Sequence, residues 1–300
     1  MICDLCPRRC GAERTEEEGR GVCRRPAAPK LARAGLHMWE EPCITNERGS
    51  GTVFFAGCQL RCVFCQNSAI SASGEGGIEF DEQKLAKLFL IQQSRGAHNV
   101  NLVTPTHYTP TIARAIDIAR QDGLTIPIVW NSSAYEKKDT LALLKNRVDI
   151  YLPDYKYASS YLAKRYSKAE DYPEIARTAI DEMVAQQPKC VFNDEGELIK
   201  GVIVRILLLP GAVEDAKERV AYIHKRYGDK VYLSLMSQYT PHGDLSSYPE
   251  LCRTVTQDEY DELIDYAVSI GVTQGFTQEL EAAEESFIPS FACEGLEDFI

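Results

Sequence analysis

The sequence predicts an α/β fold in which six strand–helix units follow one another, preceded by a small cysteine-rich segment. From Gly51 onward, short runs of β-branched or apolar residues alternate with longer segments of helical period. This is the pattern of parallel strands joined by crossover helices. The region before that point is polar, and four of its cysteines are closely spaced. We therefore predict a cysteine-rich segment at residues 1–48, an α/β body at 49–285 and a C-terminal tail at 286–300.

Length and composition fit one large core. The chain has 300 residues, of which 44% are hydrophobic, and an α/β barrel of about 250 residues commonly forms a single domain. Its formal charge of -11 disfavours binding to nucleic acid or an anionic membrane. No apolar run approaches the ~20 residues that span a bilayer, and the polar start is unlike a secretory leader. We expect a cytoplasmic protein with reduced thiols.

Cys3, Cys6, Cys10 and Cys23 predict a metal site in the N-terminal segment. Pro7 and several glycines between them turn the backbone, and a segment so short and polar buries too little to fold alone. Four thiolates at such spacing are typical of a structural metal. Zinc and a second iron–sulfur cluster are both compatible with the spacing, and free thiols are the alternative.

The segment before the first predicted strand mixes an aromatic residue, two carboxylates and a further cysteine. We interpret it as a docking segment in which Trp39 and Ile44 cover the lower edge of the body, while Glu40 and Glu41 face water. Cys43 is a candidate replacement ligand for the N-terminal metal site.

The body is predicted to contain six strands and six helices. The strands lie at residues 52–56, 100–103, 126–130, 148–152, 202–209 and 231–235. The helices lie at residues 81–94, 111–121, 135–145, 172–186, 213–227 and 256–269. Asp81 is a helix-capping residue at the start of the first helix, and glycines at 96, 123 and 271 follow three of the helices.

The most informative stretch is the loop after the first predicted strand. Cys58, Cys62 and Cys65 are separated by three and then two residues, so one tight loop directs three thiols at a common point. Thiolates this close repel one another unless a metal neutralises them. Zinc prefers four ligands in a closed structural site, whereas a [4Fe-4S] cluster accepts three protein thiolates and leaves one iron open. The loop therefore favours such a cluster over a zinc knuckle or plain buried thiols.

These cysteines, with Phe64 directly before the third, resemble the CxxxCxΦC signature of radical S-adenosylmethionine (SAM) enzymes. In that superfamily the amino and carboxylate groups of SAM chelate the open iron, and the aromatic residue lies near the adenine. The wider stretch through Asn67 resembles activating enzymes of glycyl-radical enzymes, in particular the pyruvate formate-lyase-activating-enzyme-like (PflX-like) branch. The resemblance covers about residues 50–280. It implies a radical SAM partial (β/α)6 barrel and SAM contacts at Phe64 and Asn67.

In parallel α/β barrels the chemistry gathers at the carboxyl ends of the strands. The second predicted strand ends in Thr104, Thr106 and His107, where many radical SAM proteins carry a Gly-Gly-Glu turn that holds the methionyl ammonium. Thr104 is our candidate for an ammonium contact, and His107 is either a substrate-side acid or base or a capping residue. The third strand ends in Trp130 and Asn131, where activating enzymes show an Asp-Thr-Asn-Gly stretch. We predict that Asn131 contacts the ligand.

Charged residues follow the next two strands. Asp154 and Lys156 lie two positions apart on an extended chain and therefore face the same side. They resemble the Asp-x-Lys of activating enzymes, whose lysine contacts the SAM carboxylate, and a surface ion pair is the alternative. Arg205 stands in an otherwise apolar strand, so it requires an acidic partner such as the SAM carboxylate or Asp154. After the sixth strand, Gln238 and His242 are further candidates for a contact near the ribose.

Together these features predict a radical SAM enzyme. The resemblance implies that a reduced [4Fe-4S] cluster passes one electron into SAM, and that the resulting 5′-deoxyadenosyl radical abstracts a hydrogen from the substrate. The implied substrate is a glycine of a partner glycyl-radical enzyme, and the implied electron donor is a reductant such as flavodoxin or ferredoxin. Radical modification of a small molecule or of another protein side chain is the alternative within the superfamily. A non-catalytic iron–sulfur or zinc protein is the alternative outside it.

Overall fold

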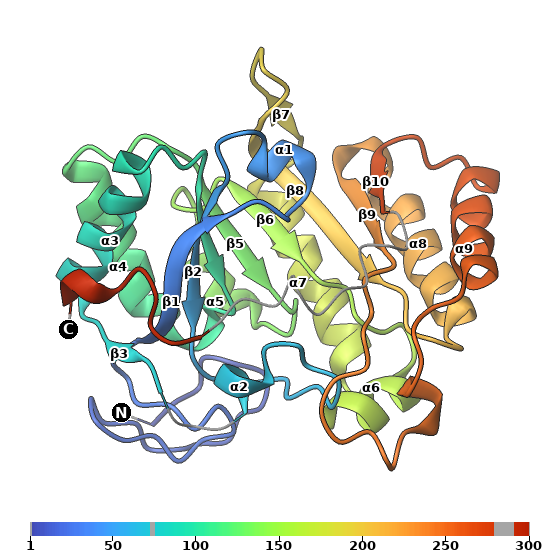
Figure 1. Cartoon of the computed structure of the whole chain (residues 1–300), viewed down its shortest axis with the longest axis horizontal. Helices are drawn as coiled ribbons and strands as arrows, with labels where there is room; N and C mark the ends of the chain where they lie inside the picture. The colour runs from blue at the N-terminus through green and yellow to red at the C-terminus, as the bar shows by residue number, and fades with distance from the viewer. Residues whose placement is uncertain (1, 73–75, 279–290, 300) are drawn as a thin grey trace.

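A computed structural model describes residues 2–72, 76–278 and 291–299, and its core is a parallel sheet with helices on its outer face (Figure 1). The parallel strands are β2 (Ser50–Phe55), β4 (Val100–Val103), β5 (Ile128–Ser132), β6 (Ile150–Pro153), β8 (Leu198–Leu207), β9 (Tyr232–Met236) and β10 (Gly275–Thr277). From β2 to β9 they lie side by side in chain order. This is the arrangement expected when each strand is joined to the next by a crossover helix.

Three antiparallel strands complete the sheet. They are β1 (Lys30–His37), β3 (Ile78–Glu79) and β7 (Val191–Phe192). Strand β1 pairs antiparallel with β2 and with β3, so both lie at the edge beyond β2. Strand β7 pairs antiparallel with β8.

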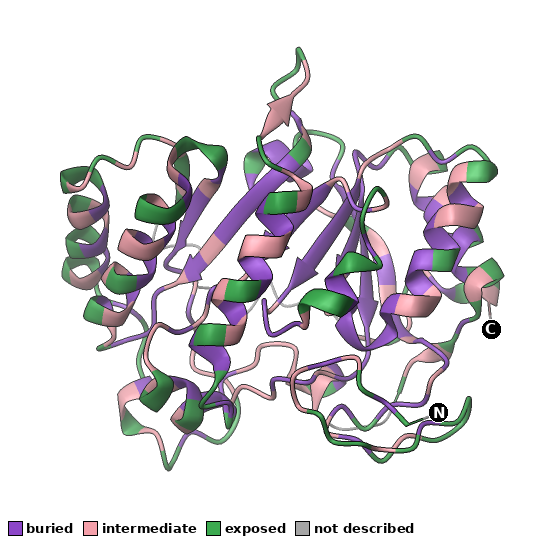
Figure 2. Ribbon diagram, turned by 180° about the vertical axis from the view of Figure 1, so that it is seen from behind, coloured by how far each residue is buried: buried purple, intermediate pink, exposed green. Residues whose placement is uncertain are grey.

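The longer helices pack their buried faces on the sheet, as Figure 2 shows from behind. They are α3 (Glu82–Ser94), α4 (Thr109–Gln121), α7 (Tyr172–Gln186), α8 (Val213–Tyr227) and α9 (Gln257–Ser269). Shorter helices are α1 (Pro42–Thr45), α2 (Ser68–Ser71), α5 (Lys138–Ala142) and α6 (Ser160–Ser167). None of the helices in the described ranges is long and apolar enough to cross a membrane.

The predicted α/β fold is confirmed, and all six predicted strands and helices are found within a few residues of their expected bounds. The strands and α-helices of the described residues that were not predicted are β1, β3, β7, β10, α1, α2 and α6. The helix expected at residues 135–145 is shorter, at Lys138–Ala142. It starts late because the chain turns at Ala134, whose φ is +56°, and because the buried Glu136 side chain bonds back to the end of β5.

Helix α1 closes the end of the barrel where the parallel strands begin. Cys43 and Ile44 pack there against Val129 of β5 and Ile150 of β6. The prediction that Ile44 covers the lower edge is therefore confirmed. Cys43, by contrast, is not a ligand of the N-terminal metal site, because α1 and the N-terminal segment lie at opposite ends of the sheet (Figure 1).

The prediction for the rest of this segment was wrong. Glu40 and Glu41 do not face water, since the Glu40 side chain is 10% exposed and Glu41 is buried. Glu40 instead bonds to the Arg205 guanidinium and the Asn101 amide inside the barrel. Trp39 does not cover an edge either, because it is 63% exposed and lines the cavity described below.

The N-terminal segment packs beneath the carboxyl ends of the strands. An antiparallel bridge between Ile2 and Glu13 closes one loop, and a second bridge joins Arg14 to Gly19. Arg8 ties the segment to the body by donating to the carbonyl oxygens of Gln59 and Leu60 at 2.8 and 2.9 Å.

At the other end of the chain, residues 291–299 form a strap along the free edge of β1. Ala34 N donates to Glu294 O, and Cys293 N donates to Ala32 O, both at 3.0 Å. Leu296 is fully buried. The strap accounts for part of the predicted tail, of which residues 286–290 lie outside the described ranges, as do residues 279–285 of the predicted body.

Candidate active site

The cysteine loop follows β2 directly and is fixed by backbone bonds at both ends. Gly57 N donates to Ile70 O at 2.8 Å, and Val63 N donates to Tyr166 O at 2.9 Å. Gly57 has φ +88°, and a Cβ atom there would lie 2.4 Å from Arg25 Cγ. Only glycine fits this position, because other residues rarely adopt a positive φ and none could avoid the contact. The loop is therefore held against the N-terminal segment.

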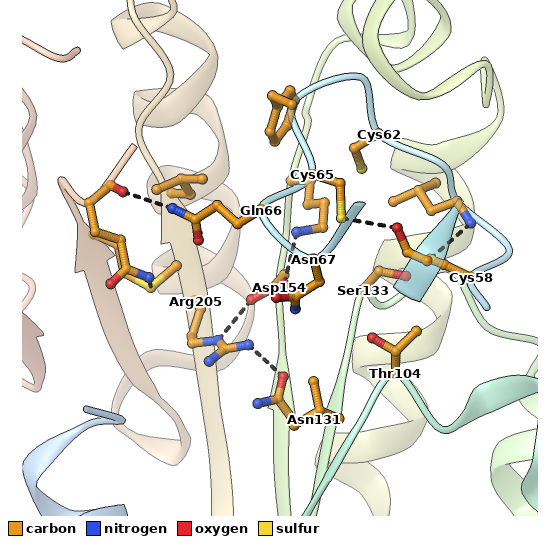
Figure 3. Close-up of a pocket in the computed structure, with 18 of the residues that line it drawn as sticks. Cys58, Cys62, Cys65, Gln66, Asn67, Thr104, Asn131, Ser133, Asp154 and Arg205 are labelled. Atoms are coloured by element: carbon orange, nitrogen blue, oxygen red, sulfur yellow. Dashed lines mark hydrogen bonds and ion pairs between the residues drawn. The ribbon is translucent and has the colours of Figure 1, made fainter. Parts of the chain in front are cut away.

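The three thiols of the loop converge on one cavity of about 320 Å³ (Figure 3). Each sulfur has a polar neighbour: Leu60 N lies 3.4 Å from Cys58 Sγ, Ser167 Oγ lies 3.0 Å from Cys62 Sγ, and Ser71 Oγ lies 3.3 Å from Cys65 Sγ. These bonds orient the thiols. The prediction of a common point for Cys58, Cys62 and Cys65 is in accord with this geometry.

Burial makes two of these thiols, those of Cys62 and Cys65, poor anions without a metal. It raises the pKa of Cys65 to about 12, with further repulsion from Cys62 and Cys58. Burial also raises the pKa of Cys62, and the Lys156 ammonium opposes that rise. A bound cationic metal centre would remove the cost of a buried negative charge, because it neutralises the thiolate form of these side chains. Without such a centre they remain protonated thiols.

Phe64 and Asn67 take different places in the loop. Phe64 is 6% exposed and contacts Tyr166 and Tyr239 edge to face, at centroid distances of 6.3 and 5.9 Å. It lines the cavity as part of an aromatic wall. Asn67 is half-buried and lies beside the cavity at the start of α2.

Opposite the loop, four charged side chains form one network inside the barrel. Lys156 Nζ lies 2.8 Å from Asp154 Oδ2, as expected for residues that face the same side. Arg205 Nε lies 2.7 Å from Asp154 Oδ1, and its Nη1 lies 3.0 Å from Glu40 Oε2. Arg205 Nη2 also donates to Asn131 Oδ1 at 2.5 Å. Two cations thus balance two anions, and the guanidinium uses all three of its nitrogens within the protein.

The pKa values in this network follow from competition between burial and pairing. Burial alone would raise the pKa of Asp154, but Arg205 and Lys156 outweigh it and hold this pKa below its usual range. Burial would lower the pKa of Lys156, but Asp154 and Cys62 outweigh it and raise this pKa. For Glu40 burial prevails, and its pKa is raised against the pull of Arg205. Lys156 is therefore a fixed cation that faces both Asp154 and the thiols.

The ends of β4 and β5 contribute Thr104 and Asn131. Both line the cavity, and Thr104 N donates to Asn131 O at 2.9 Å. Thr104 has φ +58°, which is a strained conformation for a β-branched residue. Such strain is often found where a backbone must be aimed at a ligand.

His107 and Trp130 point away from this cavity. His107 is 2% exposed, its Nε2 lies 2.9 Å from Ala56 O, and burial lowers its pKa to about 3. It is therefore not a substrate-side acid or base. Trp130 is fully buried and its Nε1 donates to Glu136 Oε1 at 2.9 Å. Glu136 also accepts from Thr106 and Ser132. One buried carboxylate therefore binds both Thr106, in the stretch where many radical SAM proteins carry Gly-Gly-Glu, and Trp130, where activating enzymes carry Asp-Thr-Asn-Gly.

Several residues around the site were missed by sequence reasoning. Glu40 lies far from the strand ends in sequence, and no local pattern reveals it. Ser167 lies on α6. The sequence signal for this helix was weak, because it consists of Ser159, a helix-capping residue, followed by a short stretch of helical period. Gln238 was a candidate and lines the cavity, whereas His242 contacts Ser68 Oγ at 3.1 Å instead. Other unpredicted lining residues include His37, Trp39, Gln66, Ser133, Tyr239, Thr240 and Gln278.

The N-terminal cysteines lie outside this cavity, on the far side of the cysteine loop. Cys3, Cys6 and Cys23 are buried and Cys10 is exposed. Among the described residues, no three His, Cys, Asp or Glu side chains are gathered as ligands of a single metal ion. The zinc form of the predicted N-terminal site therefore gains no support from the geometry.

The chain is similar to known proteins in sequence and in fold. The sequence model of the Radical SAM superfamily matches residues 52–215. The "Uncharacterized protein MJ0674" of Methanocaldococcus jannaschii is 29% identical over 274 residues, which cover 88% of this chain and 74% of that protein.

Among solved structures, a radical SAM methyltransferase from Sphaerobacter thermophilus matches with a TM-score of 0.52 at 12% identity, over 76% of this chain and 65% of that one. Streptococcus suis SuiB bound to its precursor peptide SuiA matches with a TM-score of 0.50 at 15% identity, over 76% of this chain and 48% of SuiB. The chain thus matches less than two thirds of either structure's length. At these identities the likeness concerns the fold alone.

Proposed function

The chain belongs to the radical SAM superfamily, and on that premise we propose that Cys58, Cys62 and Cys65 hold a [4Fe-4S] cluster while the adjoining cavity binds SAM. The observation that carries this proposal is the convergence of three thiols on one cavity. Among the described lining residues these are the only cysteines, so one iron would lack a protein ligand and remain open to SAM.

The cavity fits a polar ligand. Ser133 Oγ and Thr240 Oγ1 are buried in its wall and have no hydrogen-bond partner among the described residues. Buried hydroxyl groups are normally satisfied, so a bound molecule with polar groups would complete them. The volume of about 320 Å³ also lies within the range of about 300–1,000 Å³ that is usual for small-molecule sites.

Each predicted contact receives a role in this proposal. Lys156 binds the SAM carboxylate, because it is a fixed cation that faces the thiols. Asp154 orients Lys156, and Arg205 acts through Asp154 as a positioning residue, since its nitrogens are already occupied. The remaining proposed contacts are Phe64 beside the adenine, with Asn67, Thr104 and Asn131 bonding the other polar groups of SAM.

When bound, the reduced cluster supplies one electron to SAM, which is cleaved to methionine and a 5′-deoxyadenosyl radical that abstracts hydrogen from the substrate. The protein's own contribution is orientation and exclusion of water. The aromatic contacts of Phe64 with Tyr166 and Tyr239 close the cavity beside the loop. Lys156 and the hydroxyl group of Ser167 face the thiols and stabilise their charged form.

For the substrate we propose a peptide segment of a partner protein, and specifically the glycine of a glycyl-radical enzyme. Three side-chain amides, those of Gln66, Gln238 and Gln278, line the cavity with the exposed Trp39. Amides pair with peptide N–H and C=O groups in both directions, which supports a peptide. A flavodoxin-type or ferredoxin-type protein is the proposed electron donor. A small molecule, or another protein side chain, is the competing substrate.

The first test is SAM cleavage. The protein would be reconstituted anaerobically with iron and sulfide, supplied with reductant and SAM, and assayed for 5′-deoxyadenosine. We expect product from the wild type and none from Cys58→Ala. A wild-type protein with a full cluster that cleaves no SAM would contradict the proposed function and favour a non-catalytic iron–sulfur protein.

The second test concerns the substrate. Candidate partner peptides deuterated at glycine would be supplied, and 5′-deoxyadenosine would be analysed for deuterium by mass spectrometry. Label from glycine is the expected result. Deuterium transferred only from a labelled metabolite, or only from another side chain, would replace the glycyl-radical proposal with one of its competitors.

A further inference from the structure

The four N-terminal cysteines gather at one place in the structure. The bridge between Ile2 and Glu13 closes the loop that carries the first three of them. The next loop folds back on it, because a Cβ atom at Gly21 would lie 3.0 Å from Cys10 Sγ. Cys3, Cys10 and Cys23 all lie near enough to Cys6 to repel its thiolate. The spacing seen in the sequence is therefore realised as one cluster of thiols.

A buried cation stands beside this cluster of thiols. Arg14 is 5% exposed, and its Nη1 lies 3.6 Å from Cys3 Sγ. Arg25, which is 1% exposed, instead extends towards the cluster loop, where its Nη2 donates to Ile70 O at 3.2 Å. Buried charges are costly unless they are compensated. A centre held by four thiolates carries a net negative charge that the Arg14 guanidinium helps to offset.

The arrangement of the thiols bears on which centre they could hold. In a zinc site each sulfur lies about 2.3 Å from one metal ion, so the thiols must surround a single point. Among the described residues no group of three or more potential ligands is placed to hold one metal ion, and this includes Cys58, Cys62 and Cys65 of the cluster loop. A centre of several iron and sulfur atoms is larger than one ion and can bind thiols that lie further apart.

We propose that Cys3, Cys6, Cys10 and Cys23 bind a second iron–sulfur cluster. This proposal rests on the proposed function in one respect, namely that the Cys58 loop holds a cluster. All four irons of a cubane, or both irons of a smaller cluster, would then be ligated by protein, so this centre would transfer electrons without binding a substrate.

The second cluster would lie between solvent and the cluster loop. Cys10 is exposed. On the other side, a Cβ atom at Gly57 would lie 2.9 Å from the carbonyl oxygen of Cys23, so this ligand touches the residue before Cys58. Arg61 Nη1 also donates to Val22 O at 3.4 Å. The segment is thus packed directly on the loop that it would supply with electrons.

The proposed transfer involves one electron and no bond changes. A flavodoxin-type or ferredoxin-type donor is oxidised by one electron, and the N-terminal cluster accepts that electron and passes it on. It returns to its starting oxidation state, while the loop cluster is reduced by one electron. No proton or leaving group is required.

Metal analysis tests the site without relying on activity. The triple variant Cys58→Ala/Cys62→Ala/Cys65→Ala removes the loop cluster, and we expect it to retain about four iron atoms per chain if the second cluster is a cubane, or about two if it is smaller. The unmutated protein should then hold about eight or about six. Cys252→Ala, at an exposed cysteine that does not line the cavity, should leave the iron content unchanged.

Zinc in place of iron in the triple variant would overturn the proposal, and so would the absence of any bound metal. If the triple variant misfolds, the iron content of the unmutated protein still tests the proposal. About four iron atoms per unmutated chain would correspond to the loop cluster alone and would also overturn the proposal. These counts do not depend on SAM. A protein with both clusters that cleaves no SAM would therefore contradict the proposed function while leaving this site intact.

The path of the electron has its own test. Reduction of the loop cluster would be followed by electron paramagnetic resonance in wild type and Cys10→Ala, with a flavodoxin-type donor and with dithionite. We expect at least a tenfold slower reduction of Cys10→Ala by the protein donor and similar rates with dithionite, which is small enough to reach the loop cluster directly. Equal rates with the protein donor would show that electrons enter elsewhere.

Discussion

Arg205 and Glu40 form an ion pair inside the barrel, with 3.0 Å between Nη1 and Oε2, although 165 positions separate them in the chain. Their side chains are 12% and 10% exposed. Arg205 reaches Asp154 with its Nε at the same time. The carboxylate that orients Lys156 is thus fixed, through one guanidinium, to a segment that precedes the first parallel strand.

Replacing Glu40 by Gln should destabilise the protein. The substitution keeps the shape and the bond from Asn101, but it removes one of the two negative charges that compensate Arg205. We expect the free energy of unfolding in urea to fall by roughly 1–3 kcal/mol. Glu47→Gln, at an exposed position nearby, should change it by less than about 0.5 kcal/mol. Equal effects of the two variants would indicate that Glu40 is protonated in the folded protein.

Replacing Lys156 by Met should weaken SAM binding and leave the loop cluster in place. Lys156 is not a cluster ligand, but it is the proposed partner of the SAM carboxylate, a bond of the strength usual for charged groups. We expect the Kd for SAM to rise at least tenfold, or about 1.4 kcal/mol, at unchanged iron content. Lys164→Met, at an exposed residue paired with Glu170, is the matched control. Loss of iron in Lys156→Met would assign the residue to cluster assembly instead.

Gly57→Ala should cost more stability than an alanine at an unobstructed glycine. The positive φ of Gly57 and the close contact with Arg25 Cγ both oppose a side chain, so we expect a loss of roughly 2–4 kcal/mol. Gly123 also has a positive φ, but nothing lies within 4 Å of its missing Cβ. Gly123→Ala should therefore lose only about 1 kcal/mol. If Gly57→Ala and Gly123→Ala lose similar stability in thermal unfolding, then Arg25 and the N-terminal segment move aside to make room for the added methyl group.

Stability should fall in acid through Glu197, which lies at the opposite end of the sheet from the thiols. Burial alone would raise its pKa, but Arg48, Asn46 and Asn193 outweigh it and lower this pKa to about 2. Because the folded pKa is below that of the unfolded chain, the stabilisation is complete above about pH 4.5 and is lost as the pH falls towards 2. We expect it to be on the order of 2 kcal/mol.

Glu197→Gln tests this directly. At pH 7 the variant should unfold at lower urea concentration than wild type, and below about pH 3 the two curves should approach each other. Glu195→Gln, at an exposed neighbour whose carboxylate lies 3.9 Å from Arg48, should show little of either effect. A stability difference that stays constant from pH 7 to pH 3 would place the acid sensitivity in other groups.

The sequence predicts those parts of the site whose residues lie close together in the chain. The cysteine loop depends on spacing within one turn of chain, and Asp154 and Lys156 depend on the two-residue period of a strand. Both were predicted. The partner of Arg205 was predicted only as an acid, because nothing local links Glu40 to a strand that begins more than 150 positions later.

The missed elements have the same cause. The sequence of β1 contains two alanines and a glycine and has no β-branched residue, so its propensity for a strand is low. Its extended form is stabilised by pairing with β2 over six residue pairs. Glu136 was missed because its three donors come from two places, the end of β5 and the buried turn that follows β4. Tertiary contacts, rather than local preference, decide such positions.

The strap at residues 291–299 bears on how the chain folds as it is synthesised. Its backbone bonds to Ala34 and Ala32 join segments that leave the ribosome about 260 residues apart, as the pairing of Arg33 with Glu294 illustrates. Until the strap emerges, the outer edge of β1 has unpaired N–H and C=O groups, which can pair with other chains. We therefore expect the nascent chain to be most prone to aggregation when β1 and β2 are already paired but the strap is still in the exit tunnel.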